Sequence, residues 1–203
     1  MPRSAERTRQ RILDAAYVLF RRKGYTRVSM DEVAGAATLT KRTLYYHFKS
    51  KDGLLTAVLE GQHRLALAAF RTFGARLSGS PEAMIDALFK ELDIWSATPR
   101  WAGSGFTRLV IELADLPGHP ARLIARRHKA MLEAHLADLL AKAHVDSPHE
   151  RAREIWLLAE GAMSMILIHG DRNYVAAAAQ AAKRLLDGNR PRKRPAHRMR
   201  NLC

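Results

Sequence analysis

The sequence predicts an all-α protein, and three observations lead to this fold class. Apolar residues recur at helical spacing in successive stretches along the 203-residue chain. Serine and threonine caps begin several of these stretches, and glycines and prolines end them. No stretch alternates apolar and polar residues as a half-buried strand does, and no Gly-rich phosphate loop is present. We expect a small N-terminal domain of three helices followed by a larger helical bundle.

The first helix is expected to follow Ser4, whose side chain can cap its start. Its apolar face includes Ile12, Ala16 and Phe20. Cations at 21–23 gather in its last turn, where positive charge suits the helix dipole, and a glycine then offers a left-handed stop. Arginines at positions 3, 7, 9 and 11 form either a solvated face or an arm that follows a phosphate backbone.

The next two helices are short and closely spaced. Ser29 and Glu32 have the spacing of a capping box, which predicts that a helix begins there. The alanines of this helix allow another helix to approach closely. After the turn at Thr38, Thr40 can cap a third helix. A helix, a short capped helix, a tight turn and a basic helix are typical of a helix-turn-helix, whose recognition helix enters the major groove of DNA.

The third helix is expected to have an inward and an outward face. Leu44 and Phe48 lie one turn apart and define the inward stripe. The outward face combines cations, hydroxyls and aromatic rings, which suit base edges and phosphates better than bulk water. The other interpretation is a solvated helix face that happens to be basic. The candidate contacts to bases or adjacent backbone are Ser29, Thr40, Lys41, Arg42, Thr43 and Tyr45, and the candidate phosphate contacts are Tyr46, His47 and Lys51.

The stretch from Ser29 to Leu55 resembles the DNA-binding domain of TetR-family regulators. The resemblance rests on the pair Val33-Ala34, on the run Thr-Leu-Tyr-Tyr-His-Phe at 43–48, and on Lys51-Asp52 ahead of two leucines. It covers about residues 8–57. One departure is Thr38, which stands where the family usually has glycine and is strained if the backbone there needs a positive φ. Arg42, where glycine is also common in the family, adds a candidate base-reading side chain.

The fourth helix is predicted to begin at Lys51-Asp52-Gly53 and to continue for about seven turns. In the TetR family this long helix joins the two domains. Five further helices are expected at about 81–97, 101–116, 120–143, 148–169 and 172–187. The expected domains are residues 1–52 for the helix-turn-helix, 53–187 for ligand binding and dimerisation, and 188–203 for a basic, disordered tail.

The last two predicted helices are candidates for a dimer interface. The helix at 148–169 is apolar on nearly all sides and must be covered all round, while the helix at 172–187 is rich in alanine. Two such helices from each of two chains would form a four-helix interface with twofold symmetry. Alternatively, they complete the core of a monomer. We favour the homodimer, because two helix-turn-helix units can read two half-sites one turn of DNA apart.

Positive charge is concentrated at the two ends of the chain, whose formal net charge is +14. Residues 1–60 carry 12 Lys and Arg against 6 Asp and Glu, and residues 188–203 carry 6 against none. Residues 61–187 are nearly balanced, with 16 against 14. A polyanion is therefore expected to meet the ends. The tail either adds nonspecific affinity for DNA or serves solubility.

The sequence predicts a cytoplasmic protein. Cys203 is the single cysteine, so no intrachain disulfide can form and a reducing compartment is expected. The first residues lack the apolar run of a secretory signal. The longest stretches free of charged residues reach only about half the length that a bilayer crossing needs.

The residues indicate neither an enzyme nor a metal centre. The nine histidines do not pair at adjacent helical turns with a carboxylate or thiol ligand beside them. No serine, cysteine or lysine lies in a nucleophile motif, and Glu112 and Asp115 are expected to be surface charges rather than an acid–base pair. We therefore expect no catalytic residue, no metal and no cofactor.

Large apolar side chains are frequent in the middle of the chain, and most of them should form plain core. Some are expected to line a cavity, because similar proteins bind small, often apolar molecules there. The candidates are Trp95, Trp101, Phe106, Met131, Trp156 and Met163, with Arg108 and His135 to orient the ligand by polar contact. The implied function is a homodimeric repressor that binds a pseudo-palindromic operator and is released by a small, mainly apolar ligand. The alternative is an architectural DNA-binding protein of low specificity without a ligand.

Overall fold

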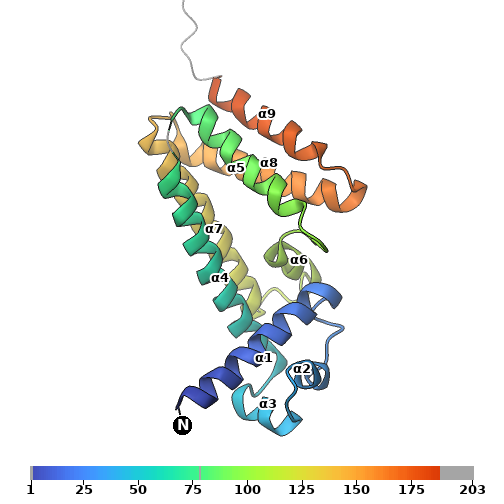
Figure 1. Ribbon diagram of the computed structural model, residues 1–203. Coiled ribbons are helices and arrows are strands. Elements are labelled where there is room, and N and C mark those ends of the chain that lie inside the picture. The colour runs from blue at the N-terminus through green and yellow to red at the C-terminus, as the bar shows by residue number, and fades with distance from the viewer. Residues whose placement is uncertain (1, 78, 188–203) are drawn as a thin grey trace, which may run out of the picture.

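The computed structural model describes residues 2–77 and 79–187, which form nine α-helices and no strand (Figure 1). The helices are α1 (Pro2–Lys23), α2 (Met30–Ala36), α3 (Lys41–His47), α4 (Lys51–Arg76), α5 (Pro81–Ser96), α6 (Gly105–Glu112), α7 (Pro120–Lys142), α8 (Pro148–His169) and α9 (Asn173–Asp187). The predicted all-α fold is confirmed. The predicted basic tail at 188–203, with Cys203, lies outside the described residues. No described helix is long and apolar enough to span a bilayer.

The first three helices fold around a small core of their own. Ile12 and Ala16 of α1 pack with Val33 of α2 and Leu44 of α3, and none of these four side chains is more than 1% exposed. Phe48 is also buried, so the predicted inward stripe of the third helix is confirmed. The first turns of α4 complete this core, which fixes the orientation of α3 relative to the long helix.

The helix starts follow the predicted capping residues with one exception. The amide of Glu32 donates to the Ser29 hydroxyl over 3.1 Å, and the amide of Ser29 donates to the Glu32 carboxylate over 2.9 Å, which confirms the capping box. Thr40 accepts from the amide of Thr43 over 3.1 Å at the start of α3. The prediction for Ser4 is wrong, since α1 already begins at Pro2 and Ser4 lies within its first turn.

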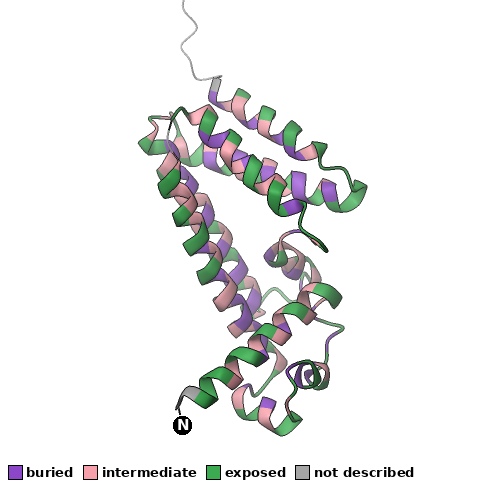
Figure 2. Cartoon of the chain, viewed as in Figure 1, coloured by how far each residue is buried: buried purple, intermediate pink, exposed green. Residues whose placement is uncertain are grey.

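The long helix α4 runs from the helix-turn-helix to the far end of the molecule beside α7 (Figure 1). Helices α5, α7, α8 and α9 enclose the largest core, which includes Phe89, Leu140 and Ile155. Buried residues lie where these helices face one another, and the outer sides of α8 and α9 are exposed (Figure 2). A third core, around Leu55, Leu59 and residues of α6 and α7, joins the two halves.

The helix predicted at 101–116 is shorter in the structure, where α6 covers only Gly105–Glu112. Gly103 has a φ of +74°, a left-handed conformation that a helix cannot continue through. Ser104 then caps α6 by accepting from the amide of Thr107. Trp101 therefore lies in a loop and not on the helix. The other four predicted helices of this half agree with the structure to within about a residue at each end.

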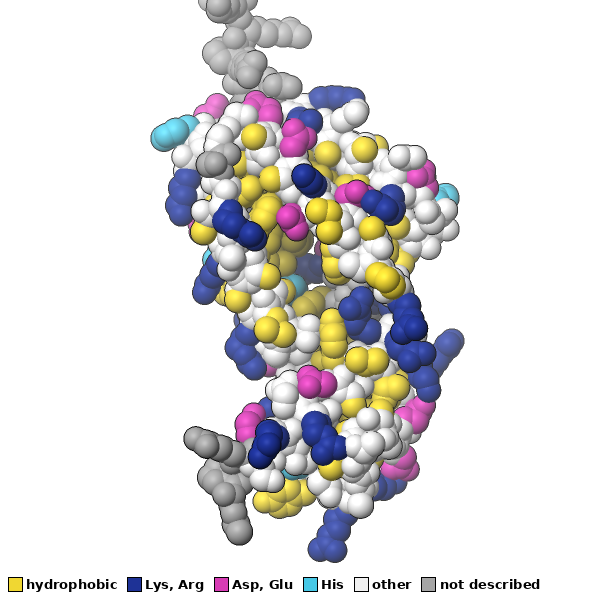
Figure 3. All heavy atoms as spheres, in the orientation of Figure 1, with side chains coloured by type: hydrophobic (Ala, Val, Ile, Leu, Met, Phe, Trp, Pro, Cys, Tyr) yellow, Lys and Arg dark blue, Asp and Glu magenta, His cyan; other side chains and the backbone are white. Residues whose placement is uncertain are grey.

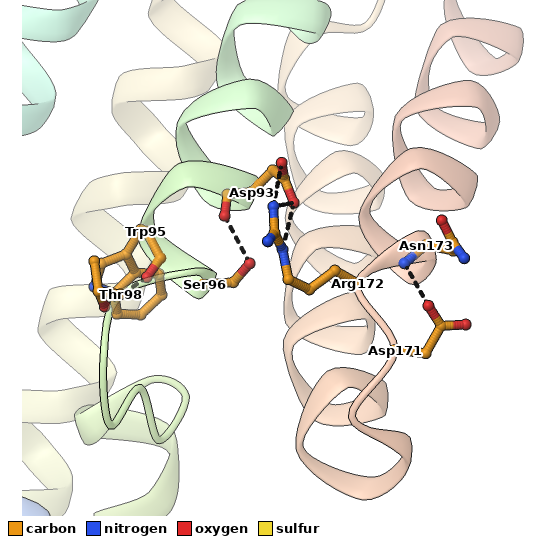
Figure 4. Close-up of polar contacts among 7 residues, drawn as sticks. All are labelled: Asp93, Trp95, Ser96, Thr98, Asp171, Arg172 and Asn173. Carbon is orange, nitrogen blue, oxygen red and sulfur yellow. Dashed lines mark hydrogen bonds and ion pairs between the residues drawn. The ribbon is translucent and has the colours of Figure 1, made fainter.

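The start of α9 is tied to the end of α5 by an ion pair (Figure 4). Arg172 donates through Nε and Nη2 to Asp93, with contacts of 3.0 Å and 2.7 Å to Oδ1 and 2.7 Å to Oδ2. Asp171 accepts from the amide of Asn173 over 2.9 Å in the same loop. Because both charged side chains are partly exposed, this pair orients α9 more than it stabilises the fold.

Candidate nucleic-acid interface and ligand cavity

The outward face of α3 presents large side chains to solvent. Tyr46 is 75% exposed and Tyr45 is 38% exposed, and Arg42 is also exposed. The ring of Tyr46 meets the ring of His47 edge-on, with centroids 5.3 Å apart. A face of this composition can donate hydrogen bonds to phosphates and base edges. On the opposite side of the helix, Leu44 is fully buried in the core.

Several of the other predicted DNA contacts already have partners within the helix-turn-helix. The hydroxyls of Ser29 and Thr40 cap α2 and α3, and the Thr40 and Thr43 hydroxyls lie 2.9 Å apart. Lys41 forms an ion pair with Asp31 of α2, and hydrogen bonding and charge from Asp31 raise the pKa of Lys41. Of these contacts only the exposed ion pair between Lys41 and Asp31 links α3 to α2, and contact with DNA would have to share or replace these bonds.

Lys51 lies at the start of α4 and turns toward the loop that follows α1. Its ammonium group donates to the carbonyl of Thr26 over 3.2 Å and lies 4.3 Å from the centre of the Tyr25 ring. Partial burial lowers the pKa of Lys51. The predicted phosphate contact is thus a half-buried cation beside the α1–α2 loop.

A cavity of about 690 Å³ lies between the helix-turn-helix and the upper bundle. Helices α1, α4, α5, α6, α7 and α8 all contribute to its wall, and Figure 3 shows a hollow at the waist of the molecule with hydrophobic side chains in it. Its volume falls within the range of small-molecule sites. Of the eight predicted ligand contacts, five line it: Trp95, Phe106, Arg108, Trp156 and Met163.

The structure does not bring the other three predicted ligand contacts to the cavity wall. Trp101 packs edge-on against Trp95, with ring centroids 5.6 Å apart. His135 accepts a hydrogen bond from Arg71 over 3.1 Å. Met131 is partly buried elsewhere on α7. All three share a helical or loop segment with true wall residues, and the sequence pattern alone cannot separate the two groups.

Sequence reasoning missed an ion pair in the cavity wall, between Lys129 of α7 and Glu160 of α8. Lys129 also donates to the Ser104 hydroxyl over 3.0 Å, and Thr107 donates to Glu160 over 2.7 Å. Glu160 is the single charged residue between 155 and 168, in an otherwise apolar helix. A lone charge in such a stretch was the available signal for a polar wall position.

Two buried histidines face each other between α4 and α7. The Nδ1 atoms of His63 and His128 lie 3.1 Å apart, and the His128 ring stacks on Phe106 with centroids 3.8 Å apart. Burial, followed by the charge of Lys129, lowers the pKa of His128 to about 4, and burial also lowers the pKa of His63. Both rings are therefore neutral at pH 7, with one donating to the other. The described residues contain no group of three metal-ligating side chains.

Helix α6 holds the end of α1 and the loop after it. Glu112 accepts from the amides of Tyr25 and Thr26 over 3.0 and 2.6 Å, and from the Thr26 hydroxyl over 2.6 Å. Partial burial acts to raise the pKa of Glu112, but these hydrogen bonds outweigh it and the pKa is lowered. Arg108 donates to the carbonyl of Arg21 over 3.0 Å. Movement of α6 would therefore act directly on the helix-turn-helix.

Known proteins are similar to this chain, in sequence over its N-terminal part and in fold over most of its length. A sequence model of bacterial regulatory proteins of the tetR family matches residues 12–58. The Tn10 TetC protein of Escherichia coli is 46% identical over 55 residues, which are 27% of this chain and 28% of TetC. The HTH-type transcriptional regulator UidR of E. coli K12 is 38% identical over 71 residues, 35% of this chain and 36% of UidR. The match thus spans about a third or less of these two curated relatives.

The likeness to solved structures extends over nearly the whole chain. The crystal structure of a TetR-family transcriptional regulator from Streptomyces coelicolor has a TM-score of 0.79 and 25% identity, and the match covers 89% of this chain and 95% of that one. The match therefore includes the helical bundle as well as the helix-turn-helix. Residues 12–58 of this chain therefore match the model of the tetR family of bacterial regulatory proteins, and the fold of the chain is similar to that of TetR-family transcriptional regulators.

Proposed function

We propose that this chain is a repressor that binds a pseudo-palindromic operator as a homodimer and is released by a small, mainly apolar ligand. The observation that carries the proposal is the exposed face of α3, where Arg42, Tyr45 and Tyr46 project from a helix anchored by the fully buried Leu44. Arg42 would read a base edge, and Tyr46, His47 and Lys51 would contact phosphates. The remaining contacts, at Ser29, Thr40, Lys41, Thr43 and Tyr45, would reach bases or adjacent backbone.

The outer face of α8 supports a homodimer through α8 and α9. Leu157 is 68% exposed and Ile168 is 66% exposed, and Gly161 and Ser164 lie between them on the same helical face. The neighbouring face of α9 presents small side chains such as Ala177. An apolar stripe with small residues in it suits close packing against the same stripe of a second copy about a twofold axis.

The cavity supports release by a ligand. Its wall includes α6, which holds the helix-turn-helix through Glu112 and Arg108, and α4, which runs into the helix-turn-helix core. A ligand that binds one conformer of these helices more tightly shifts the population toward it, by no more than the difference in its affinity for the two states. Operator affinity would fall if that conformer spaces the two α3 helices wrongly.

Selection of bound duplexes from a random pool tests the DNA-binding part of the proposal. A homodimeric regulator should select two inverted half-sites about one helical turn apart. It should also bind the selected duplex at least about three decades more tightly than random duplex at the same salt concentration. A selected pool without symmetry, bound no better than random DNA, would support the alternative of a low-specificity architectural protein.

A further inference from the structure

We propose that the cavity takes an amphipathic anion, whose charged group is held by Arg21 and Arg108 at the end nearest the helix-turn-helix. This inference rests on the proposed function, because it assigns a chemical class to the ligand of that cavity. It is carried by the arrangement of charges in the wall.

Two of the three carboxylates of the wall, Glu112 and Glu160, are occupied by other groups. Of its seven charged residues, Arg21, Arg76, Arg108 and Lys129 are cations, and Glu91, Glu112 and Glu160 are anions. Glu160 pairs with Lys129, so these two charges cancel. Glu112 lies close enough to Arg108 to be affected by its charge, but its two oxygens already accept three hydrogen bonds from residues 25 and 26.

Arg21 and Arg108 have neutral partners in place of carboxylates. Arg108 donates from Nη1 to the carbonyls of Arg21 and Ala102, over 3.0 and 3.3 Å. Arg21 donates to the Tyr17 hydroxyl over 3.3 Å and lies over the Tyr17 ring at 5.6 Å from its centre. Neither guanidinium forms an ion pair within residues 2–77 and 79–187. Both cations are half-buried and line the cavity without an ion-pair partner, so an anion bound beside them would be stabilised by charge-assisted hydrogen bonds.

The rest of the wall suits an apolar tail. Phe70 and Phe73 of α4 and Phe89, Leu92 and Trp95 of α5 line it, and Phe106 of α6 closes it on another side. Figure 3 shows hydrophobic side chains within the hollow and Lys and Arg side chains at its margin. A cation-lined end and an aromatic-lined body together select a ligand with one anionic head and one hydrocarbon tail. Because Arg108 also holds the carbonyl of Arg21, such a head would act on the end of α1.

The test compares three probes that share a ten-carbon chain and differ in head charge: decanoate, decan-1-ol and decyltrimethylammonium. Binding to the full-length protein is followed by calorimetry and by the fluorescence of the tryptophans, below the concentrations at which the probes aggregate. Decanoate should bind at least about tenfold more tightly than decan-1-ol, as expected for charge-assisted hydrogen bonds to arginine. The cationic probe should bind most weakly.

Variants then locate the source of this preference. Arg108→Met and Arg21→Met should each reduce the preference for decanoate over decan-1-ol, and the double variant should abolish it, while affinity for decan-1-ol is kept. Arg108→Lys keeps the charge and should keep most of the preference. Arg76→Met is the matched control, because Arg76 is also a cation of the wall but bonds to the Thr72 carbonyl near the far end of α4.

Equal affinity for decanoate and decan-1-ol, tighter binding of the cationic probe, or no saturable binding of any probe would overturn the inference. A preference for decanoate that survives in the folded double variant would overturn it as well. Because these measurements use no DNA, they are separate from the proposed function. A chain that shows the predicted probe preference yet fails to discriminate between duplexes leaves this inference standing and refutes the repressor.

Discussion

Arg11 of α1 holds Thr38 in the turn between α2 and α3. Its guanidinium donates to the Thr38 hydroxyl and, over 2.6 Å, to the carbonyl of Ala37. Thr38 has a φ of +53°, so the left-handed backbone that glycine usually provides at this position is present here without glycine. This conformation costs a threonine roughly 1 kcal/mol or more. The bonds from Arg11 span 26 and 27 residues and offset part of that cost.

Arg11→Ala should lower the free energy of unfolding by about 1 kcal/mol, because it removes the donor to the Ala37 carbonyl. Urea unfolding followed by circular dichroism measures the change. Arg7→Ala, another exposed arginine of α1, is the control and should change stability by less than about 0.5 kcal/mol. Equal effects of the two substitutions would mean that the contact with the turn contributes nothing.

Arg42→Ala and Lys51→Ala should separate sequence reading from general attraction to DNA. Arg42 is exposed on α3, so its loss should cost about 1–3 kcal/mol on the selected operator and relax the choice of base at one position of each half-site. Lys51 lies beside the α1–α2 loop, so its loss should weaken binding to every duplex alike. Fluorescence anisotropy on operator and random duplexes at fixed salt measures both. Equal losses on the two duplexes for Arg42→Ala would contradict its assignment.

The helix-turn-helix could be predicted from the sequence because its determinants are local. Ser29 and Glu32 cap α2 across three residues, and Leu44 and Phe48 face inward one turn apart. The start of α6 depends instead on distant contacts. Gly103, with a φ of +74°, lies against Leu167 of α8, and a Cβ at this position would lie 2.7 Å from Cδ1 of Leu167. No periodicity near residue 103 carries that information.

The cavity was only partly predictable for the same reason. Aromatic residues identify candidates for an apolar wall, but they do not show which of them reach the cavity. Trp95 lines the cavity, whereas Trp101 packs edge-on against the ring of Trp95 and does not line it. The clamp from Glu112 to the α1–α2 loop joins residues 86 and 87 positions apart. The sequence alone predicts that Glu112 is a surface charge beside Asp115, whereas its carboxylate accepts from the amides of residues 25 and 26. Contacts between distant elements determine its role.

Glu112→Gln should weaken the junction between α6 and the helix-turn-helix, with a loss of about 1 kcal/mol at pH 7. The lowered pKa of Glu112 means that the unfolded chain takes up its proton first on acidification. The stability from this group is therefore present above its ordinary value of 4.5 and is lost as pH falls through the lower folded value. Glu32, whose pKa is lowered to about 2, contributes in the same direction.

The measurement is the urea midpoint of the wild-type protein and the variant between pH 7 and pH 3.5. On acidification the wild type should lose more stability than Glu112→Gln. Because both proteins keep Glu32, the difference between their losses gives the contribution of the Glu112 carboxylate alone. Asp115→Asn, an exposed carboxylate three residues away, is the control and should behave as the wild type does. A variant with the same acid dependence as the wild type would argue against the clamp.

Leu157→Glu should convert a homodimer into a monomer. The side chain is 68% exposed on α8, and a carboxylate there would meet its own symmetry copy if two α8 helices pack about a twofold axis. Analytical ultracentrifugation measures the mass of the particle in solution and so distinguishes dimer from monomer. Operator affinity should fall by at least about a hundredfold, because a monomer contacts only one half-site. Leu123→Glu, at a position on α7 that is 62% exposed, is the control. A dimer that persists in Leu157→Glu would place the interface elsewhere.

Replacing both buried histidines, in the variant His63→Leu with His128→Leu, should remove a loss of stability on mild acidification. The folded pKa of His128, about 4, lies below its ordinary value of 6.5, and the pKa of His63 is also lowered. Between these values the unfolded chain binds the proton and the folded chain does not, so stability falls as pH drops from 7 toward 5.

The wild type should lose on the order of 1 kcal/mol from this pair between pH 7 and pH 5.5, and the double variant should lose less by about that amount. Because the window lies above that of Glu112, chemical denaturation at pH 7, 6 and 5.5 separates the two effects. His149→Gln, at an exposed position near the start of α8, tests whether removing any one histidine is sufficient to reduce the loss of stability on acidification. If the double variant keeps the wild-type slope, the pair must accept a proton without leaving the folded state, and the buried Nδ1 contact would not hold both rings neutral.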